Sequence, residues 1–280
     1  MKRSIALVLL VVLLLCGCAP AEPAADVTQP PVTSAPITEP TTEATTEPTT
    51  EPTTEPTQAE PEKVTIYLLE KSVIYDSGFT SYHYDENYNI DTYQVHTIEN
   101  DLMCTVSFEE KNADGMATKH RLEWTDGSSQ LRLLTYFADG KLKEDQEDFS
   151  TFTGYQYGYD ENGNLTEKRE YYEGLLCATV RYEYVGTELC RVYCEDPEGN
   201  HIFDCRVENQ RIIEKVCYDA GVYSYSTMYE YDDHGNLVKE SINYDGETIP
   251  GIMYYYKAVE VDAARAPYLL EQQKYLISVP

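Results

Sequence analysis

The 280-residue sequence has one tryptophan, five histidines and few basic residues, and it lacks the short motifs of common enzyme classes. No Gly-x-Ser-x-Gly nucleophile elbow, no His-Glu-x-x-His zinc motif and no glycine-rich phosphate loop occurs in it. Carboxylate pairs such as Glu109 and Glu110 are too common in so acidic a chain to identify an acid–base site. We therefore expect a protein that is not an enzyme and holds neither a metal nor a cofactor.

Positive charge is scarce, with 21 lysines and arginines against 49 aspartates and glutamates, for a formal net charge of −28. Charge of this sign repels phosphate backbones and anionic membrane surfaces. The composition therefore excludes nucleic acid as an expected partner. It leaves cationic, neutral glycan and protein partners open.

Long hydrophobic runs are also missing, apart from a short one at the N-terminus. Lys2 and Arg3 precede an uncharged stretch from Ile5 to Leu15. A membrane-spanning helix needs about 20 apolar residues, whereas the central region of a signal peptide is about this short. The pattern predicts a signal peptide over residues 1–17.

The residues that follow the run, Leu15-Cys16-Gly17-Cys18, resemble the lipobox of bacterial lipoproteins. The resemblance implies cleavage after Gly17, a lipid on Cys18, and membrane attachment through that lipid, because more than one acyl chain anchors stably. We expect an extracytoplasmic protein, anchored to the bacterial cell membrane and exposed at the cell surface. The alternative is an ordinary signal peptide.

Residues 18–62 form a segment of a different composition. Ten of the fourteen prolines lie in it, no tyrosine or phenylalanine does, and Glu-Pro-Thr-Thr repeats from Glu39 to Pro56. Such a segment has too little apolar surface to offset the entropy of ordering, and its prolines favour an extended chain. It is expected to be a disordered stalk that projects the next domain from the membrane, or that simply keeps it mobile.

Residues 63–280 carry a pattern of β-strands and tight turns. All 26 tyrosines lie in this part, often at alternate positions, as in Tyr155, Tyr157 and Tyr159. A period of two places such side chains on one face of a strand, and the Asn-Gly and Asp-Gly pairs between the runs supply hairpin turns. We expect an all-β domain, with one helical segment from Pro267 to Lys274.

Two turns share the pattern Tyr-x-Tyr-Asp-x-x-Gly-Asn-Leu, at Tyr157–Leu165 and Tyr229–Leu237, and a weaker copy begins at Tyr82. The pattern resembles the YD repeat of RHS-type proteins. The resemblance implies tandem β-hairpins that stack on one another in an elongated or curved antiparallel sheet. The turn residues that the resemblance assigns in this chain are Asp160, Gly163, Asn164, Asp232, Gly235 and Asn236.

Six cysteines follow Cys18, and five of them lie between Cys177 and Cys217. Outside the cytoplasm such a set favours disulfides, and a turn at Asp196–Gly199 would bring Cys190 roughly opposite Cys205. Free thiols are an open alternative. A zinc site is disfavoured because no Cys-x-x-Cys pair is present.

Aromatic side chains are the candidate ligand-binding residues, because their faces suit the apolar sides of sugar rings. They are Trp124, Tyr157, Tyr159, Tyr229 and Tyr231. Packing between repeats is the alternative role for the tyrosines. The oxygen-bearing turns at Asp160 and Asp232 also resemble part of a Ca²⁺ loop but depart from its glycine and glutamate positions, so turn formation accounts for them.

Together these features predict a surface-anchored, non-catalytic lipoprotein that binds an extracellular glycan or protein through the Tyr-rich domain. One alternative is a structural envelope protein that self-associates through exposed sheet edges. Another is a glycan hydrolase that uses paired carboxylates.

Overall fold

The computed structural model describes residues 61–149, 151–277 and 279–280. The predicted signal peptide, Cys18 and nearly all of the predicted stalk lie outside these residues. The described part contains sixteen strands and a C-terminal helix, α2 (Ala266–Leu276). The strands are β1 (Lys63–Ile74), β2 (Gly78–Tyr84), β3 (Ile90–Thr97), β4 (Leu102–Phe108), β5 (Lys119–Trp124), β6 (Ser129–Tyr136), β7 (Leu142–Glu147), β8 (Gly154–Tyr159), β9 (Leu165–Tyr172), β10 (Leu175–Val185), β11 (Glu188–Glu195), β12 (His201–Glu208), β13 (Arg211–Asp219), β14 (Val222–Tyr231), β15 (Leu237–Tyr244) and β16 (Glu247–Asp262).

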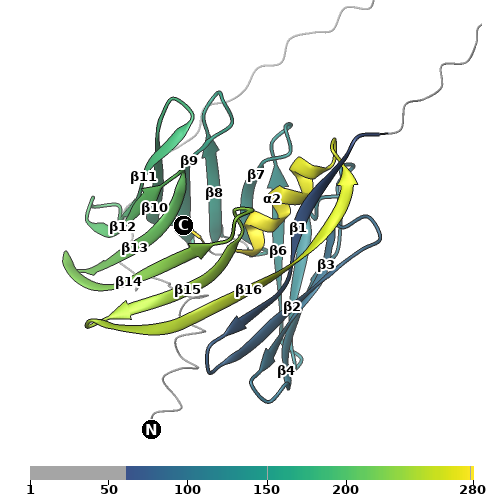
Figure 1. The fold of residues 1–280 in the computed structure, drawn as a ribbon, viewed down its shortest axis with the longest axis horizontal. Helices are drawn as coiled ribbons and strands as arrows, with labels where there is room; N and C mark the ends of the chain where they lie inside the picture. Colours follow the sequence, from purple (N-terminus) through teal and green to yellow (C-terminus); the bar gives the residue numbers. More distant parts are fainter. Residues whose placement is uncertain (1–60, 150, 278) are drawn as a thin grey trace, which may run out of the picture. The chain divides into compact units, whose positions relative to one another are not determined.

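The sixteen strands form one closed antiparallel barrel, in which each strand pairs with its neighbours in sequence and β1 pairs with β16 (Figure 1). The fold is all-β, but the expectation of an elongated or curved open sheet is wrong. The closing pair runs from Lys63 opposite Asp262 to Ile74 opposite Ile252. Closure satisfies the backbone N–H and C=O groups that an open sheet would leave unpaired at its first and last strands.

The barrel is built from a hairpin unit that recurs at a period of roughly 25 residues. In most units the equivalent position holds tyrosine, but Phe108 and Val207 occupy two of them. The ladder shifts register directly before this position in six units, for example between Gly158 and Tyr159. A β-bulge of this kind increases local twist and helps a sheet to curve. The equivalent positions are Tyr84, Phe108, Tyr136, Tyr159, Tyr184, Val207, Tyr231 and Tyr256.

The tyrosines at this position link each unit to the previous one. Each hydroxyl donates a hydrogen bond of 2.7 to 3.1 Å to a backbone carbonyl 15 to 19 residues earlier in the chain. The six bonds therefore form a ladder around the inside of the barrel wall. The donor–acceptor pairs are Tyr84–Leu69, Tyr136–Ala117, Tyr159–Leu142, Tyr184–Leu165, Tyr231–Ile212 and Tyr256–Leu237.

The turns after these tyrosines are held by aspartate side chains. Oδ1 of Asp160 accepts hydrogen bonds from the N–H groups of Asn162 and Asn164, at 2.9 and 2.8 Å. Asp232 makes the same contacts with His234 and Asn236. The glycine of each turn has a positive φ, +80° at Gly163 and +89° at Gly235, which favours a residue without a side chain.

Helix α2 lies inside the ring of strands, and the C-terminus follows it there (Figure 1). Leu269 of the helix is buried in a cluster with Ile66 and Leu68 of β1. The Oε1 atom of Gln273 accepts the N–H of Leu69 at 2.8 Å, so a polar side chain of the helix satisfies a backbone group of the wall. The helical prediction is confirmed, and in the described residues no helix has the length and apolar content needed to cross a membrane.

Cys104, Cys190, Cys194, Cys205 and Cys217 are free thiols. The predicted pairing of Cys190 with Cys205 is wrong, because Val192 is the residue opposite Cys205. Cys190 is exposed and donates to the carbonyl of Glu183, whereas Cys205 packs against an interior cluster. The two side chains therefore point to opposite faces of the barrel wall.

Ion pairs cover the outer face of the barrel from β9 to β13. They cross each strand pair in turn: Arg181 with Glu167 and with Glu195, Arg191 with Asp204, and Arg206 with Glu214, at 3.9, 3.8, 3.3 and 3.5 Å. Pairs this exposed contribute little to stability, about 0 to 1 kcal/mol each. They indicate that this sector of the outer wall faces water.

Candidate functional sites on the barrel

The four tyrosines predicted to bind a ligand face the barrel interior. Tyr229 is 4% exposed and lies in the largest core cluster, against which Tyr231 packs. Tyr157 packs against a second cluster, and Tyr159 donates its hydroxyl to the carbonyl of Leu142. Burial raises the pKa of all four hydroxyls, to about 12 at Tyr231. These positions give the tyrosines a packing role between repeats.

The carboxylates of the turn residues Asp160 and Asp232 also accept hydrogen bonds from within the barrel. In Asp160 and in Asp232, Oδ1 accepts the N–H groups two and four residues later, and Oδ2 accepts the side-chain amide of the asparagine four residues later. These bonds lower the pKa of Asp160, led by the side-chain amide of Asn164. Within the described ranges, no group of three or more His, Cys, Asp and Glu side chains is placed to hold a metal ion.

Trp124, the remaining predicted binding residue, lies at the end of β5 and lines a hollow of about 500 Å³. The hollow is formed by the β3–β4 and β5–β6 hairpins at the barrel end opposite the turns of Asp160 and Asp232. Leu102, which is 41% exposed, and Met103 provide further apolar surface. The remaining lining is polar and comes from Thr97, Thr125, Asp126 and Ser128.

The polar groups of the Trp124 hollow are held by the tight turn from Trp124 to Ser128. The N–H of Trp124 donates to the carbonyl of Ser128 at 2.9 Å. Oδ1 of Asp126 accepts both the hydroxyl and the N–H of Ser128, at 2.6 and 2.8 Å, and these bonds lower the pKa of Asp126. The indole N–H of Trp124 donates to no described residue. The hollow thus combines an aromatic face, an available donor and an ionised carboxylate fixed by its neighbour.

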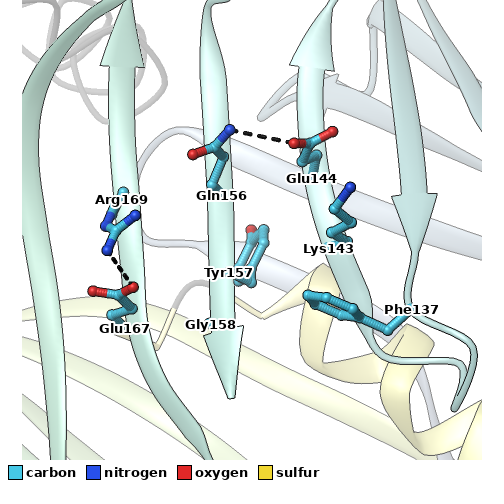
Figure 2. A pocket seen from close by; sticks show the side chains of 8 residues that line it. All are labelled: Phe137, Lys143, Glu144, Gln156, Tyr157, Gly158, Glu167 and Arg169. Carbon is cyan, nitrogen blue, oxygen red and sulfur yellow. Dashed lines mark hydrogen bonds and ion pairs between the residues drawn. The ribbon is translucent and has the colours of Figure 1, made fainter. Parts of the chain in front are cut away.

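A smaller hollow, of about 200 Å³, lies over Gly158 on the wall formed by β7, β8 and β9 (Figure 2). Gly158 contributes no side chain, so the floor of this furrow is backbone. Its rim carries Phe137, 40% exposed, and a set of charged and amide side chains. They are Lys143, Glu144, Gln156, Glu167 and Arg169.

The polar groups of the Gly158 furrow mostly satisfy one another. Gln156 donates to Glu144 at 3.2 Å, and Arg169 forms an ion pair with Glu167 at 2.6 Å (Figure 2). A Cβ atom on residue 158 would approach Cγ of Glu167 to 2.8 Å, so this side chain already covers part of the floor. A ligand here would have to displace existing bonds, and the Trp124 hollow is the better candidate site.

The Gly158 furrow was missed at the sequence level. Gly158 falls between two tyrosines of a repeat, where a glycine is easily attributed to the turn that follows. Its signal is the position on the strand: Tyr157 and Tyr159 face inward, so residue 158 must face outward. A glycine at an outward position of a central strand leaves a gap between the side chains of the adjacent strands.

Comparisons with known proteins reveal no family. No family model matches the chain, and no curated protein matches it significantly. A porin-like protein from Bacteroides uniformis is similar in structure at 13% identity, over 70% of this chain and 96% of the other, with a TM-score of 0.42. The TcdB2-TccC3 structure without its hypervariable C-terminal region is similar at 12% identity over 67% of this chain, with a TM-score of 0.26. This chain spans 15% of that toxin chain's length, and likenesses of this size identify no family.

Proposed function

We propose that the protein is a surface-anchored, non-catalytic lipoprotein whose barrel binds an extracellular glycan at the Trp124 hollow. The lipobox-like residues up to Cys18 support the anchor, and the Pro/Thr/Glu-rich segment supports projection from the membrane. The observation that carries the binding role is the placement of the single tryptophan in a hollow of about 500 Å³. Binding sites for small ligands have volumes of about 300 to 1,000 Å³.

The lining of the hollow matches the chemistry of a sugar. A pyranose has an apolar face that stacks on an aromatic ring and an edge of hydroxyls that donate and accept hydrogen bonds. The indole of Trp124 provides the first contact, and the Asp126 carboxylate with the Thr97 and Thr125 hydroxyls provides the second. A protein segment is the other class of ligand that this lining admits.

The barrel weakens the alternative of self-association through sheet edges. Each of the sixteen described strands is paired on both sides, so the described residues offer no free edge to a second copy. Association of copies would instead require side-chain contacts between outer walls. The size of the protein in solution at increasing concentration tests this alternative directly.

A glycan array with the full chain, read as bound protein, tests the proposal. We expect saturable binding to at least one glycan and a loss of at least tenfold in affinity for Trp124→Ala. The matched control is Tyr244→Ala, which removes an aromatic ring that is 59% exposed in the β15–β16 hairpin. Tyr244→Ala should bind as the wild type does.

Two results would overturn the assignment. A blank array with correctly folded protein would exclude the tested glycans and direct the search to a protein ligand. Binding that survives Trp124→Ala would place the site elsewhere on the barrel. Thermal unfolding of both variants is needed to show that lost binding does not reflect lost structure.

A further inference from the structure

The Trp124 hollow lies in a part of the barrel that carries negative charge without a balancing cation. Its lining comes from two chain segments, residues 97–103 and 124–128. These segments contain three carboxylates and no lysine, arginine or histidine. All three carboxylate residues are exposed, and they are Glu99, Asp101 and Asp126. Because like charges oppose association, this hollow disfavours an anionic ligand and favours a cationic one.

The cations of strand β5, which ends at Trp124, are bound to carboxylates outside the hollow. Lys119 at the start of the strand forms an ion pair with Glu110 at 2.6 Å. Arg121 forms an ion pair with Glu109, also at 2.6 Å. Neither carboxylate belongs to the lining, so these cations do not neutralise the negative charge at the other end of the strand.

The Asp126 carboxylate has one oxygen that is free for a ligand. Its Oδ1 atom accepts the hydroxyl and the N–H of Ser128, at 2.6 and 2.8 Å, and these bonds fix the carboxylate in place. The same bonds lower the pKa of Asp126, so the group is ionised at neutral pH. The described residues provide no hydrogen bond to its Oδ2 atom. An ammonium group is the donor that suits such an oxygen best, because charge-assisted hydrogen bonds are the stronger ones.

The indole of Trp124 is also open to a cation. In the described barrel, lysine or arginine groups stand over seven aromatic rings, at 4.1 to 5.7 Å from the ring centroids. Trp124 is not among these rings, although tryptophan is the side chain that attracts cations most strongly. The ring best suited to a cation therefore remains uncovered, in a hollow that also holds an ionised carboxylate.

We infer that the glycan bound at the Trp124 hollow contains an amino sugar whose amino group is free and protonated. Its ammonium group donates a hydrogen bond to Oδ2 of Asp126, while the apolar face of the sugar stacks on the indole. An N-acetylated amino sugar lacks this charge, and a sugar acid carries the opposite one. The inference rests on the proposed glycan binding and specifies the class of sugar that the hollow selects.

The test is titration calorimetry of the full chain with four β-1,4-linked oligosaccharides of equal length. Their sugars are glucosamine, N-acetylglucosamine, glucose and glucuronic acid, and a slightly acidic buffer keeps the amine protonated. We expect the glucosamine oligomer to bind about fivefold tighter than the glucose oligomer, a modest preference because both contacts are open to water. The glucuronic acid oligomer should bind most weakly. Added salt should weaken binding of the glucosamine oligomer and leave that of the glucose oligomer unchanged.

The variant Asp126→Asn removes the charge and keeps an acceptor for Ser128. It should lower the affinity for the glucosamine oligomer about fivefold, to that of the glucose oligomer, and leave the affinity for the glucose oligomer unchanged. The matched control is Asp245→Asn, which removes an exposed carboxylate from the turn between β15 and β16, outside the hollow. Asp245→Asn should retain the full preference for glucosamine.

The inference is wrong if the glucosamine oligomer does not bind, if it binds no tighter than the glucose oligomer, or if Asp126→Asn and Asp245→Asn have equal effects. Binding of the glucose and glucosamine oligomers without a preference would leave glycan binding intact and overturn only the choice of sugar. Failure of glycan binding itself would show as a blank array together with no response to any of the four oligomers. The salt dependence of the wild type tests the inference even if Asp126→Asn does not fold.

Discussion

The hydroxyl of Tyr256 donates a 2.9 Å hydrogen bond to the carbonyl oxygen of Leu237, which belongs to the preceding hairpin of the barrel. The same bond joins Tyr231 to Ile212 and Tyr184 to Leu165. A tyrosine at this position therefore fixes the spacing between successive hairpins as well as contributing its ring to the core. This relationship gives a structural role to six of the 26 tyrosines.

Removal of one such hydroxyl should destabilise the barrel. Tyr256→Phe keeps the ring but leaves the carbonyl of Leu237 without this donor, and an unsatisfied buried acceptor costs about 1 to 3 kcal/mol. Urea unfolding of Tyr256→Phe should show that loss. Tyr255→Phe, at a neighbouring position that is 48% exposed, should change the free energy of unfolding by less than about 0.5 kcal/mol. Equal effects of the two substitutions would contradict the ladder.

Gly235 is constrained by a neighbouring hairpin as well as by its own backbone. Its φ is +89°, and a Cβ atom would lie 2.5 Å from an Nη atom of Arg211, whose guanidinium stands over Tyr231. Gly199 has a similar φ of +85°, but nothing lies within 4 Å of its Cβ position. Both glycine-to-alanine substitutions carry a backbone cost of about 1 kcal/mol or more. In urea unfolding, Gly235→Ala should lower the free energy of unfolding more than Gly199→Ala does. Similar losses for the two variants would show that the Arg211 side chain moves aside freely.

Arg132 and Asp145 form a buried ion pair that contacts Tyr275 of helix α2. Asp145 is 4% exposed, accepts Nε of Arg132 at 2.8 Å, and lies 3.3 Å from the hydroxyl of Tyr275. Arg132→Met leaves a buried carboxylate without its cation, which costs about 3 to 5 kcal/mol. The double variant Arg132→Met/Asp145→Leu should recover most of this loss, as measured by chemical denaturation.

An exposed ion pair provides the control for this prediction. Arg121 binds Glu109 at 2.6 Å, and both side chains are about one-third exposed. Arg121→Met should cost far less than Arg132→Met, because water solvates the remaining carboxylate. If Arg132→Met were equally mild, water or a shifted side chain would have to solvate Asp145.

The local features of the fold were predictable from the sequence, because they depend on neighbouring residues. The alternating tyrosines predicted strands, and the Asn-Gly and Asp-Gly pairs predicted turns, as found at Gly140 and Gly163. Pro267 correctly indicated a C-terminal helix. Each of these inferences uses only a period or a turn preference within a few residues.

Closure of the barrel was not predictable in this way, because it depends on the number of units and on their accumulated twist. Two of the hairpin units are harder to recognise in the sequence, because Phe108 and Val207 stand where the other units have tyrosine. The pairing of β1 with β16 joins segments at opposite ends of the domain, and no local pattern specifies it. The buried pair of Arg132 and Asp145 was missed for the same reason, since a closed wall is needed to define an interior at all.

The thiols should differ sharply in reactivity. Cys190 is exposed, whereas Cys104, Cys194 and Cys217 are buried, and burial raises the pKa of Cys194 to about 12. Because the thiolate is the reactive form, iodoacetamide at pH 8 should modify Cys190 well before Cys194. Mass spectrometry of peptides from a time course measures the order. Modification of Cys194 at the rate of Cys190 in native protein would contradict the described interior.

The turn aspartates should make the barrel sensitive to acid. The side-chain amide of Asn164, together with its N–H, lowers the pKa of Asp160 in the folded protein below its ordinary value. A carboxylate with a depressed pKa stabilises the fold above its unfolded-state pKa of about 4, and this contribution is lost as the pH falls through the folded-state pKa.

Asp160→Asn should therefore be less stable than the wild type at pH 7, and the difference in stability should shrink as the pH is lowered below about 4. Urea unfolding at each pH measures it, with Glu161→Gln of the same turn as the control. A difference that stayed constant with pH would show that the charge of Asp160 does not hold the turn.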